Sequence, residues 1–402
     1  MTRNNDLLYQ LALTMIPNIG DVQAKGLINC YGDAASVFKA PKKQLENIEG
    51  IGTIRAANIK SFSDFSSCEA EIAFIEKYKI TALFLTDKDY PQRLLNSFDS
   101  PSLLFYRGNA DLNKSKIISI VGTRNHSDYG RHQCEKIVED LQEEDVLIVS
   151  GLAYGIDTIA HKASLKNNLA TVGVVAHGLD RIYPSQNKAL AKQMTTNGGL
   201  LTDFASGTKP DKQNFPRRNR IVAGMCDAVL VIESGLKGGS LITAELANGY
   251  NKDVFALPGK STDLKSEGCN HLIRSNKASL ITSAADILEA MNWLPKEKKS
   301  PKPQRELFIE LTPDEKTIVD ILQQSDSVQI DELNFKSGLS SSAVASALLM
   351  LEMQNVLISL PLGVLGRRGE QGGLLAPLGS DKPDLAFADA GQPGFQRRGV
   401  VG

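Results

Sequence analysis

Six short, apolar, β-rich runs alternate with helix-like segments between Lys116 and Asp286. Each run ends in a glycine-containing or polar loop before the next helix-like segment begins. Near-continuous apolar strands alternating with helices are typical of a parallel sheet covered on both faces. We therefore predict an α/β fold, a Rossmann-like, doubly wound and mostly parallel sheet, from the runs Ile117–Gly122, Val146–Gly151, Thr171–Ala176, Gly198–Phe204, Ala228–Ser234 and Asp253–Gly259.

The rest of the chain of 402 residues divides around this core, residues 114–290, by composition. Residues 1–66 are expected to form a helical, helix-hairpin-helix or SAM-like domain, and residues 67–290 the extended α/β domain. Glycine turns at Ile16–Gly20 and Gly50–Gly52 join helix ends; such turns can present backbone N–H groups to a DNA phosphate, or simply cap a small bundle. Residues 291–306 are rich in Pro and Lys and predict a linker.

Three helical segments and a strand at Val356–Ser359 predict a winged-helix domain over residues 307–360. Its eight acids and two bases give a net charge of −6. DNA-binding helices are normally basic because phosphate contacts supply most of the affinity, so this unit is expected to bind protein or nothing. Residues 361–402 hold ten of the 33 glycines and predict disorder, and we interpret them as an altered reading frame or an added tail.

Two loops of the α/β core are suited to bind an anion. Gly122-Thr123-Arg124 follows the first strand, and Gly238-Gly239-Ser240, preceded by Lys237, opens a helix. Free N–H groups at a helix start, together with a hydroxyl and a cationic side chain, form a phosphate site. Ligands of doubly wound sheets gather at the carboxyl ends of the strands, near the reversal of strand order, so both loops are expected at one edge.

A third segment, Lys212–Arg220, carries four positive charges and no acid in a chain with a net charge of −1. Its arginines, Arg217, Arg218 and Arg220, are suited to bidentate phosphate contacts. Asn219 lies between Arg218 and Arg220, and Phe215, next to the arginines, offers a surface on which an unpaired base could stack. The alternative is that the arginines pair with acids of a neighbouring element and Phe215 belongs to the core.

No catalytic, metal or cofactor site is predicted. The chain lacks a Walker lysine motif and a complete G-x-G-x-x-G after a strand, and the five cysteines and five histidines have no metal-ligand spacing. Asp157 and His161, four residues apart, are a conceivable catalytic pair but have no nucleophile beside them, which favours a structural role. No apolar run reaches a membrane-spanning length and no targeting segment is visible, so a cytoplasmic protein is expected.

Seven motifs in this order resemble the DNA-processing protein A (DprA/Smf) family: VGTR, SGLAYGID, GLDRIYP, FPRRNRIVAG, GLKGGSLITA, ALPG and SEGCNHLI. The resemblance implies a non-enzymatic, cytosolic protein that binds and protects single-stranded DNA and loads a RecA-type recombinase in natural transformation. It also implies a homodimer formed through the central domain. On the matching motif positions it implies DNA contacts for Arg124, Arg217, Arg218, Arg220 and Lys237. The sequence departs from the family pattern at His177 and Gly239, and its tail has no counterpart in the family.

Two other function classes stay open from the residues. Gly238, Gly239, Thr243 and Glu245 partly match the loop of lysine-decarboxylase-like nucleotide phosphoribohydrolases, although a third glycine is missing. An adaptor that acts through the acidic C-terminal unit is the other class, and it is compatible with DNA binding.

Overall fold

The computed structural model describes residues 2–294, 311–322, 327–353, 357–360 and 364–367. The chain forms two units, residues 1–296 and 297–402, which we describe separately. Within the described ranges, no helix combines the length and the apolar character needed to cross a membrane.

A nine-stranded sheet forms the centre of the first unit, in the order β1-β2-β6-β5-β4-β3-β7-β8-β9. Strands β3 to β9 run parallel, and β1 and β2 add an antiparallel pair beside β6. The chain builds outwards from β3 through β4, β5 and β6 and then returns to place β7 on the other side of β3. The strands are β1 (Thr81–Phe84), β2 (Leu103–Gly108), β3 (Ile117–Val121), β4 (Leu147–Ser150), β5 (Thr171–Val174), β6 (Gly198–Thr202), β7 (Ala228–Val231), β8 (Asp253–Ala256) and β9 (Ser279–Leu280).

Helices cover both faces of this sheet because consecutive strand residues point to opposite sides. Ile118 and Ile120 pack with α8 (Asp128–Asp140), α9 (Ile156–Lys166) and α14 (Ala284–Ala290). Ile117 and Val121 belong to the core of the other face, with α11 (Asn214–Gly224), α12 (Gly239–Gly249) and α13 (Glu267–Arg274). Helix α10 (Lys188–Met194), the short α7 (Gln92–Leu95) and the 3-10 turns η1 (Gln142–Glu144) and η2 (Ser185–Asn187) complete the domain. The predicted doubly wound, mostly parallel α/β fold is confirmed.

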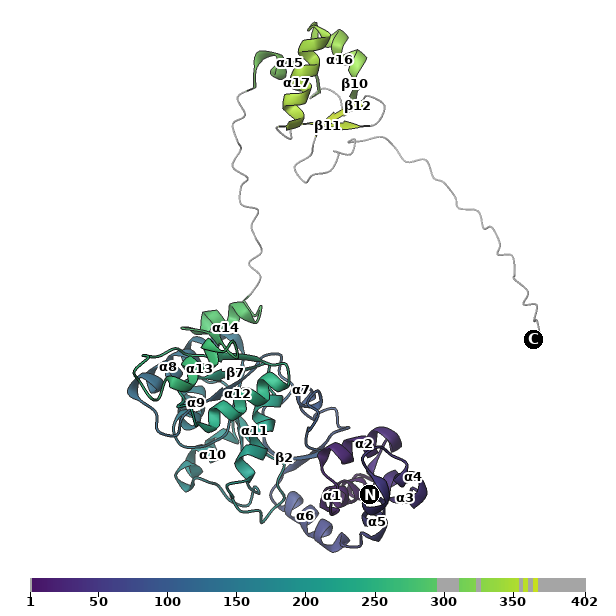
Figure 1. The fold of residues 1–402 in the computed structure, drawn as a ribbon, viewed down its shortest axis with the longest axis vertical. Coiled ribbons are helices and arrows are strands. Elements are labelled where there is room, and N and C mark those ends of the chain that lie inside the picture. Colours follow the sequence, from purple (N-terminus) through teal and green to yellow (C-terminus); the bar gives the residue numbers. More distant parts are fainter. Residues whose placement is uncertain (1, 295–310, 323–326, 354–356, 361–363, 368–402) are drawn as a thin grey trace, which may run out of the picture. The chain divides into compact units, whose positions relative to one another are not determined.

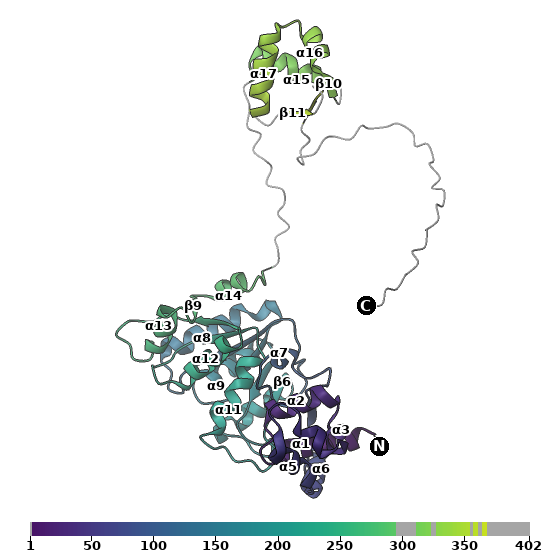
Figure 2. The same cartoon turned by 45° about the vertical axis from the view of Figure 1, so that its right-hand side comes forward.

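Six helices precede the sheet and lie together beside β2 (Figures 1 and 2). They are α1 (Thr2–Met15), α2 (Asp21–Tyr31), α3 (Ala34–Lys39), α4 (Lys42–Glu46), α5 (Gly52–Ser61) and α6 (Phe65–Lys77). Arg55 joins the two predicted glycine turns, since its Nε donates to Asn18 O and its Nη1 to Gly50 O, both at 2.8 Å. The structure thus places the two turns side by side.

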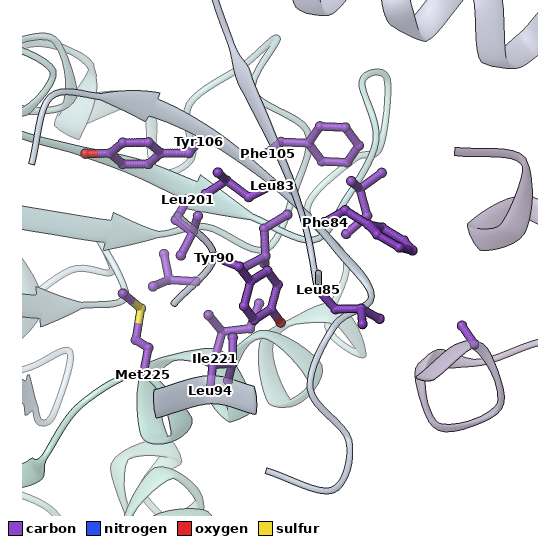
Figure 3. Packing of buried hydrophobic residues seen from close by; sticks show 14 of the residues in the cluster. Leu83, Phe84, Leu85, Tyr90, Leu94, Phe105, Tyr106, Leu201, Ile221 and Met225 are labelled. Atoms are coloured by element: carbon purple, nitrogen blue, oxygen red, sulfur yellow. The ribbon is translucent and has the colours of Figure 1, made fainter. Parts of the chain in front are cut away.

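These helices share one hydrophobic core with the sheet. Figure 3 shows Tyr90, Leu94, Phe105 and Tyr106 in this cluster with Ile221 of α11, and the same cluster extends to Leu11 of α1. The packing therefore shows no break near residue 66, and the domain boundaries stay predictions.

The second unit contains α15 (Pro313–Leu322), β10 (Ser327–Gln329), α16 (Ile330–Ser337), α17 (Ser341–Met353), β11 (Leu357–Leu360) and β12 (Val364–Arg367). Three helices around Ile318, Leu333 and Val344 and a three-stranded sheet give the predicted winged helix. One prediction needs correction, because β12 lies in the tail predicted to be disordered and pairs with both β10 and β11. The glycine content of the tail hid this strand, and the domain end at residue 360 stays a prediction. The rest of the tail, and residues 295–306 of the predicted linker, lie outside the described residues.

Candidate nucleic-acid interface

A cavity of about 380 Å³ opens at the carboxyl ends of β3, β4 and β7, where the strand order reverses. Its wall combines the loops after β3 and β4 with one side of α11 and the start of α12. This position is the expected ligand site of a doubly wound sheet. Nine of the twelve residues singled out from the sequence line it: Gly122, Thr123, Arg124, Phe215, Arg218, Asn219, Gly238, Gly239 and Ser240.

Glu233, at the end of β7, holds the loop after β3 in place. Its buried carboxylate accepts hydrogen bonds from the Ser127 N–H at 2.8 Å and the Ser127 hydroxyl at 2.6 Å. Its main-chain oxygen accepts the Thr123 N–H at 2.7 Å. Gly130 is required opposite this carboxylate, because a Cβ there would lie 2.6 Å from Glu233 Oε2. Sequence analysis missed Glu233, whose only signal was an acid directly after an apolar strand.

Arg124 is exposed at the rim of the cavity, and its Cζ lies 5.3 Å from the centre of the Phe215 ring. Within the described part of the chain, Arg124 forms no ion pair. The half-buried Phe215 ring also lies 6.1 Å from the ring of Tyr183. Phe215 therefore positions a cation at the rim while keeping part of its own surface accessible.

Arg218 lies beneath this rim, buried, with its Nη1 donating to the main-chain oxygens of Gly151 and Val174. These carbonyls are at the ends of β4 and β5, so strand termini orient the guanidinium. Gly151 makes room for it, since a Cβ there would lie 2.2 Å from Arg218 Nη1. The buried Nε of Arg218 has no hydrogen-bond partner and leaves a donor unused.

Asp157 is an acid that lines the same cavity. Burial raises the pKa of its carboxyl, against the opposing effects of Arg218 and of the Ala153 N–H, which it accepts at 3.2 Å. Burial likewise lowers the pKa of Arg218 to about 10, which still leaves the guanidinium charged near neutral pH. The electrostatic balance of the cavity therefore favours an anionic ligand.

Helix α12 contributes its N-terminus to the same wall. Gly238 and Gly239 start the helix at the cavity, whereas the Ser240 hydroxyl is buried and donates to Ser234 Oγ at 2.8 Å. Main-chain N–H groups of the first turn, not the serine hydroxyl, are then available to an anion. Lys237 is exposed in the preceding turn and does not line the cavity.

Arg217 and Arg220 lie elsewhere, which corrects their predicted place at the cavity. The Nη2 of Arg220 lies 2.7 Å from Asp203 Oδ2 and 2.8 Å from Asp21 Oδ2, and its side chain is 9% exposed. Arg217 lies 3.3 Å from Asp203, with its guanidinium over the Phe204 ring at 5.1 Å. The reason is helical periodicity, since α11 turns residues 215, 218, 219 and 222 towards the cavity and the remaining arginines towards the acids.

His161 and His177 have structural roles. Thr171 Oγ1 donates to Ile148 O at 3.0 Å, so at 2.7 Å it accepts the Nδ1–H of the fully buried His161. Burial lowers the pKa of His161 to about 3, which keeps the ring neutral, and no hydrogen bond between the described side chains joins it to Asp157. His177 is buried and its Nε2 accepts the Tyr183 N–H at 3.1 Å, which supports the loop of Tyr183.

The described residues give little support to a metal site or to a phosphoribohydrolase. No three of their His, Cys, Asp or Glu side chains are grouped as metal ligands. The phosphoribohydrolase alternative needs Glu245 at the cavity, but Glu245 pairs with Lys277 at 2.7 Å and does not line it.

Comparisons with known proteins show which family the chain resembles. The family model for DNA recombination-mediator protein A matches residues 81–292, and that for the DprA winged helix domain matches residues 298–361. The DNA processing protein DprA of Streptococcus pneumoniae is 41% identical over 239 residues, which cover 56% of this chain and 84% of that protein. Protein Smf of Synechocystis is 36% identical over 302 residues, covering 73% of this chain and 74% of that protein.

A solved structure shows the same architecture. The X-ray structure of DprA from Streptococcus pneumoniae matches with a TM-score of 0.59 and 36% identity, covering 70% of this chain and 96% of that one. The chain therefore belongs to the DNA recombination-mediator protein A (DprA/Smf) family and carries the family's winged-helix domain.

Proposed function

We propose that this protein binds single-stranded DNA at the cavity and mediates recombination without cutting the strand. The observation that carries the proposal is the pair Arg124 and Arg218, which face one cavity beside a helix N-terminus. Arg124 has no acidic partner among the described residues, and burial disfavours the charge of Asp157, the acid beside Arg218. Phosphate groups match this set of donors.

The aromatic side chains favour a single strand over a duplex. Phe215 carries Arg124 on its ring and lies near Tyr183, which is 47% exposed. Stacking of this kind needs an unpaired base, because duplex pairing hides the faces of the bases. Gly239, the first residue of α12, supplies a main-chain phosphate contact that is indifferent to sequence, whereas the Gly238 N–H already donates to Gly235 O.

Membership of the family supports the wider role. We infer that the protein protects incoming single-stranded DNA in the cytoplasm and passes it to a RecA-type recombinase during natural transformation. We also infer a homodimer formed through the central domain, in which two cavities bind one long strand and increase its affinity. Light scattering of the full chain tests the dimer, and co-sedimentation of recombinase with coated DNA tests the transfer.

The decisive experiment is a salt titration of affinity for single- and double-stranded oligonucleotides of equal length. The wild-type protein is expected to prefer the single strand, with affinity falling steeply as salt increases. Arg124→Ala should weaken binding for all sequences and reduce the salt slope by about 0.7, the value for one phosphate contact on a single strand. Lys277→Gln, which removes a surface ion pair outside the cavity, serves as the control.

Equal affinity of Arg124→Ala and wild type between about 50 and 200 mM salt would overturn the proposal. Release of a free base from nucleoside monophosphates would instead support the phosphoribohydrolase class.

A further inference from the structure

The cavity does not end at Phe215 but continues through two neighbouring recesses. A small recess of about 20 Å³ shares Arg124, Gly151, Ala153 and Phe215 with the cavity and adds the rings of Tyr154 and Tyr183. Tyr154 also lines a third recess of about 340 Å³ beside α8 and α9. Four shared wall residues thus join the cavity to the small recess, and Tyr154 stands between the small recess and the third.

Side chains of two helices give the third recess its charge. Arg131 of α8 and Lys162 of α9 both line it and are exposed. Neither forms an ion pair or a side-chain hydrogen bond within the described residues, unlike Arg220 and Lys116, which have carboxylate partners at 2.7 and 2.8 Å. Glu135 is the one acid in its wall, so two basic side chains face one carboxylate.

The next recess along α8 and α9 differs in charge. It shares Glu135 and Lys162 with the third recess and adds Lys136, Lys166, Glu139 and Asp140. Its three lysines face three acids, which gives no net charge. Electrostatic attraction for a polyanion therefore stops after Lys162.

The link between the cavity and the third recess is aromatic. Tyr154 is 41% exposed, and its hydroxyl donates to Gln186 Oε1 at 2.5 Å, which fixes the ring on the path. Tyr183, which lines the same small recess, is similarly exposed. Alternating cations and accessible rings are what a single strand needs, since phosphates and unpaired bases alternate along it.

We propose that a DNA strand held in the cavity continues past Tyr154 and Tyr183 and that Arg131 and Lys162 bind its next phosphates. This inference rests on the proposed function and extends it, because it assigns a second phosphate subsite on α8 and α9. The second subsite predicts that affinity depends on strand length. A short strand fills the cavity alone, whereas a long strand also reaches the second subsite.

The test compares the double variant Arg131→Gln/Lys162→Gln with wild type on oligothymidylates of about 4 and about 16 nucleotides, the range of typical single-strand sites. On the long strand the variant should lose two phosphate contacts, which reduces the salt slope by about 1.4. Between about 50 and 200 mM salt, the wild-type affinity should then fall about sevenfold more than that of the variant. On the short strand the two proteins should bind alike.

The matched control is Lys136→Gln/Lys166→Gln, which removes one lysine from each of the same two helices in the neutral recess. It should bind both strands as wild type does. Arg124→Ala on the short strand reports separately on the cavity. If wild type binds DNA and Arg124→Ala weakens it while Arg131→Gln/Lys162→Gln has the wild-type salt slope on the long strand, the second subsite is refuted and the proposed function stands. Absence of any single-strand binding by wild type would refute both.

Discussion

Replacing Arg220 by Ala tests whether this arginine forms an internal ion pair or contacts DNA. The guanidinium holds Asp203, whose side chain is 2% exposed, at 2.7 Å and Asp21 at 2.8 Å. Burial acts to lower the pKa of Arg220, but Asp203 and Asp21 outweigh it and raise the pKa, so the arginine is charged at every usable pH. The variant leaves the buried Asp203 with only the half-exposed Arg217, at 3.3 Å, as a cationic partner.

Removing one member of a buried ion pair typically costs about 3–5 kcal/mol when the other charge is left uncompensated, and the remaining contact of Asp203 with Arg217 places the loss at the lower end of this range. For a cooperative unit of about 290 residues, the entropy of unfolding near 60 °C is about 0.6 kcal/mol per degree. A loss of about 3 kcal/mol therefore lowers Tm by about 5 °C. The salt slope of DNA binding should be unchanged, because Arg220 does not line the cavity.

Thermal unfolding by circular dichroism measures the loss of stability, and a salt titration with a labelled single strand measures the slope. The double variant Arg220→Ala/Asp203→Asn should recover part of the lost Tm, because it also removes the most buried carboxylate. An unchanged Tm together with a salt slope reduced by about 0.7 would show that Arg220 contacts phosphate and that the structural argument is wrong.

Three further predictions concern the cavity and its floor. Gly151→Ala places a Cβ 2.2 Å from Arg218 Nη1, so it should displace the guanidinium. The expected result is a loss of about 1–3 kcal/mol of stability and weaker DNA binding. A variant that binds DNA with wild-type affinity would contradict this. Arg124→Lys should keep the salt slope and lose the contact with Phe215, which would appear as weaker binding at every salt concentration in fluorescence anisotropy. Burial lowers the pKa of His161 from 6.5 to about 3, so its contribution to stability is complete above pH 6.5 and is lost as the pH falls towards 3, by about 1.4 kcal/mol per pH unit. His161→Asn should flatten that acid slope in urea unfolding, and an unchanged slope would contradict the burial of a neutral ring.

Most of the cavity could be predicted from the sequence because of one topological rule. Apolar runs fixed the strand positions by their length, and loops that follow parallel strands meet at the same edge. Gly122, Arg124 and Gly238 are therefore found together although more than a hundred residues separate the first from the last.

The arginine run could not be divided correctly by composition. A charge count treats Arg217, Arg218 and Arg220 as equal, but a helix distributes them over different sides. Arg220 also meets Asp21, which lies 199 positions away in the sequence and belongs to the N-terminal helices. A contact of that sequence separation leaves no local signal, and the same holds for Glu233 and the loop after β3.

Arg218 shows how the centre of the site is protected from change. Its guanidinium is oriented by the oxygens of Gly151 and Val174, which belong to the polypeptide backbone and carry no proton and no side chain. Acidification cannot neutralise such an anchor, and a substitution at a neighbouring acid cannot remove it. Apart from a side chain added at Gly151, only a movement of the strand ends would reorient this cation, so substitutions of other side chains around the cavity should be tolerated better than its charge density suggests.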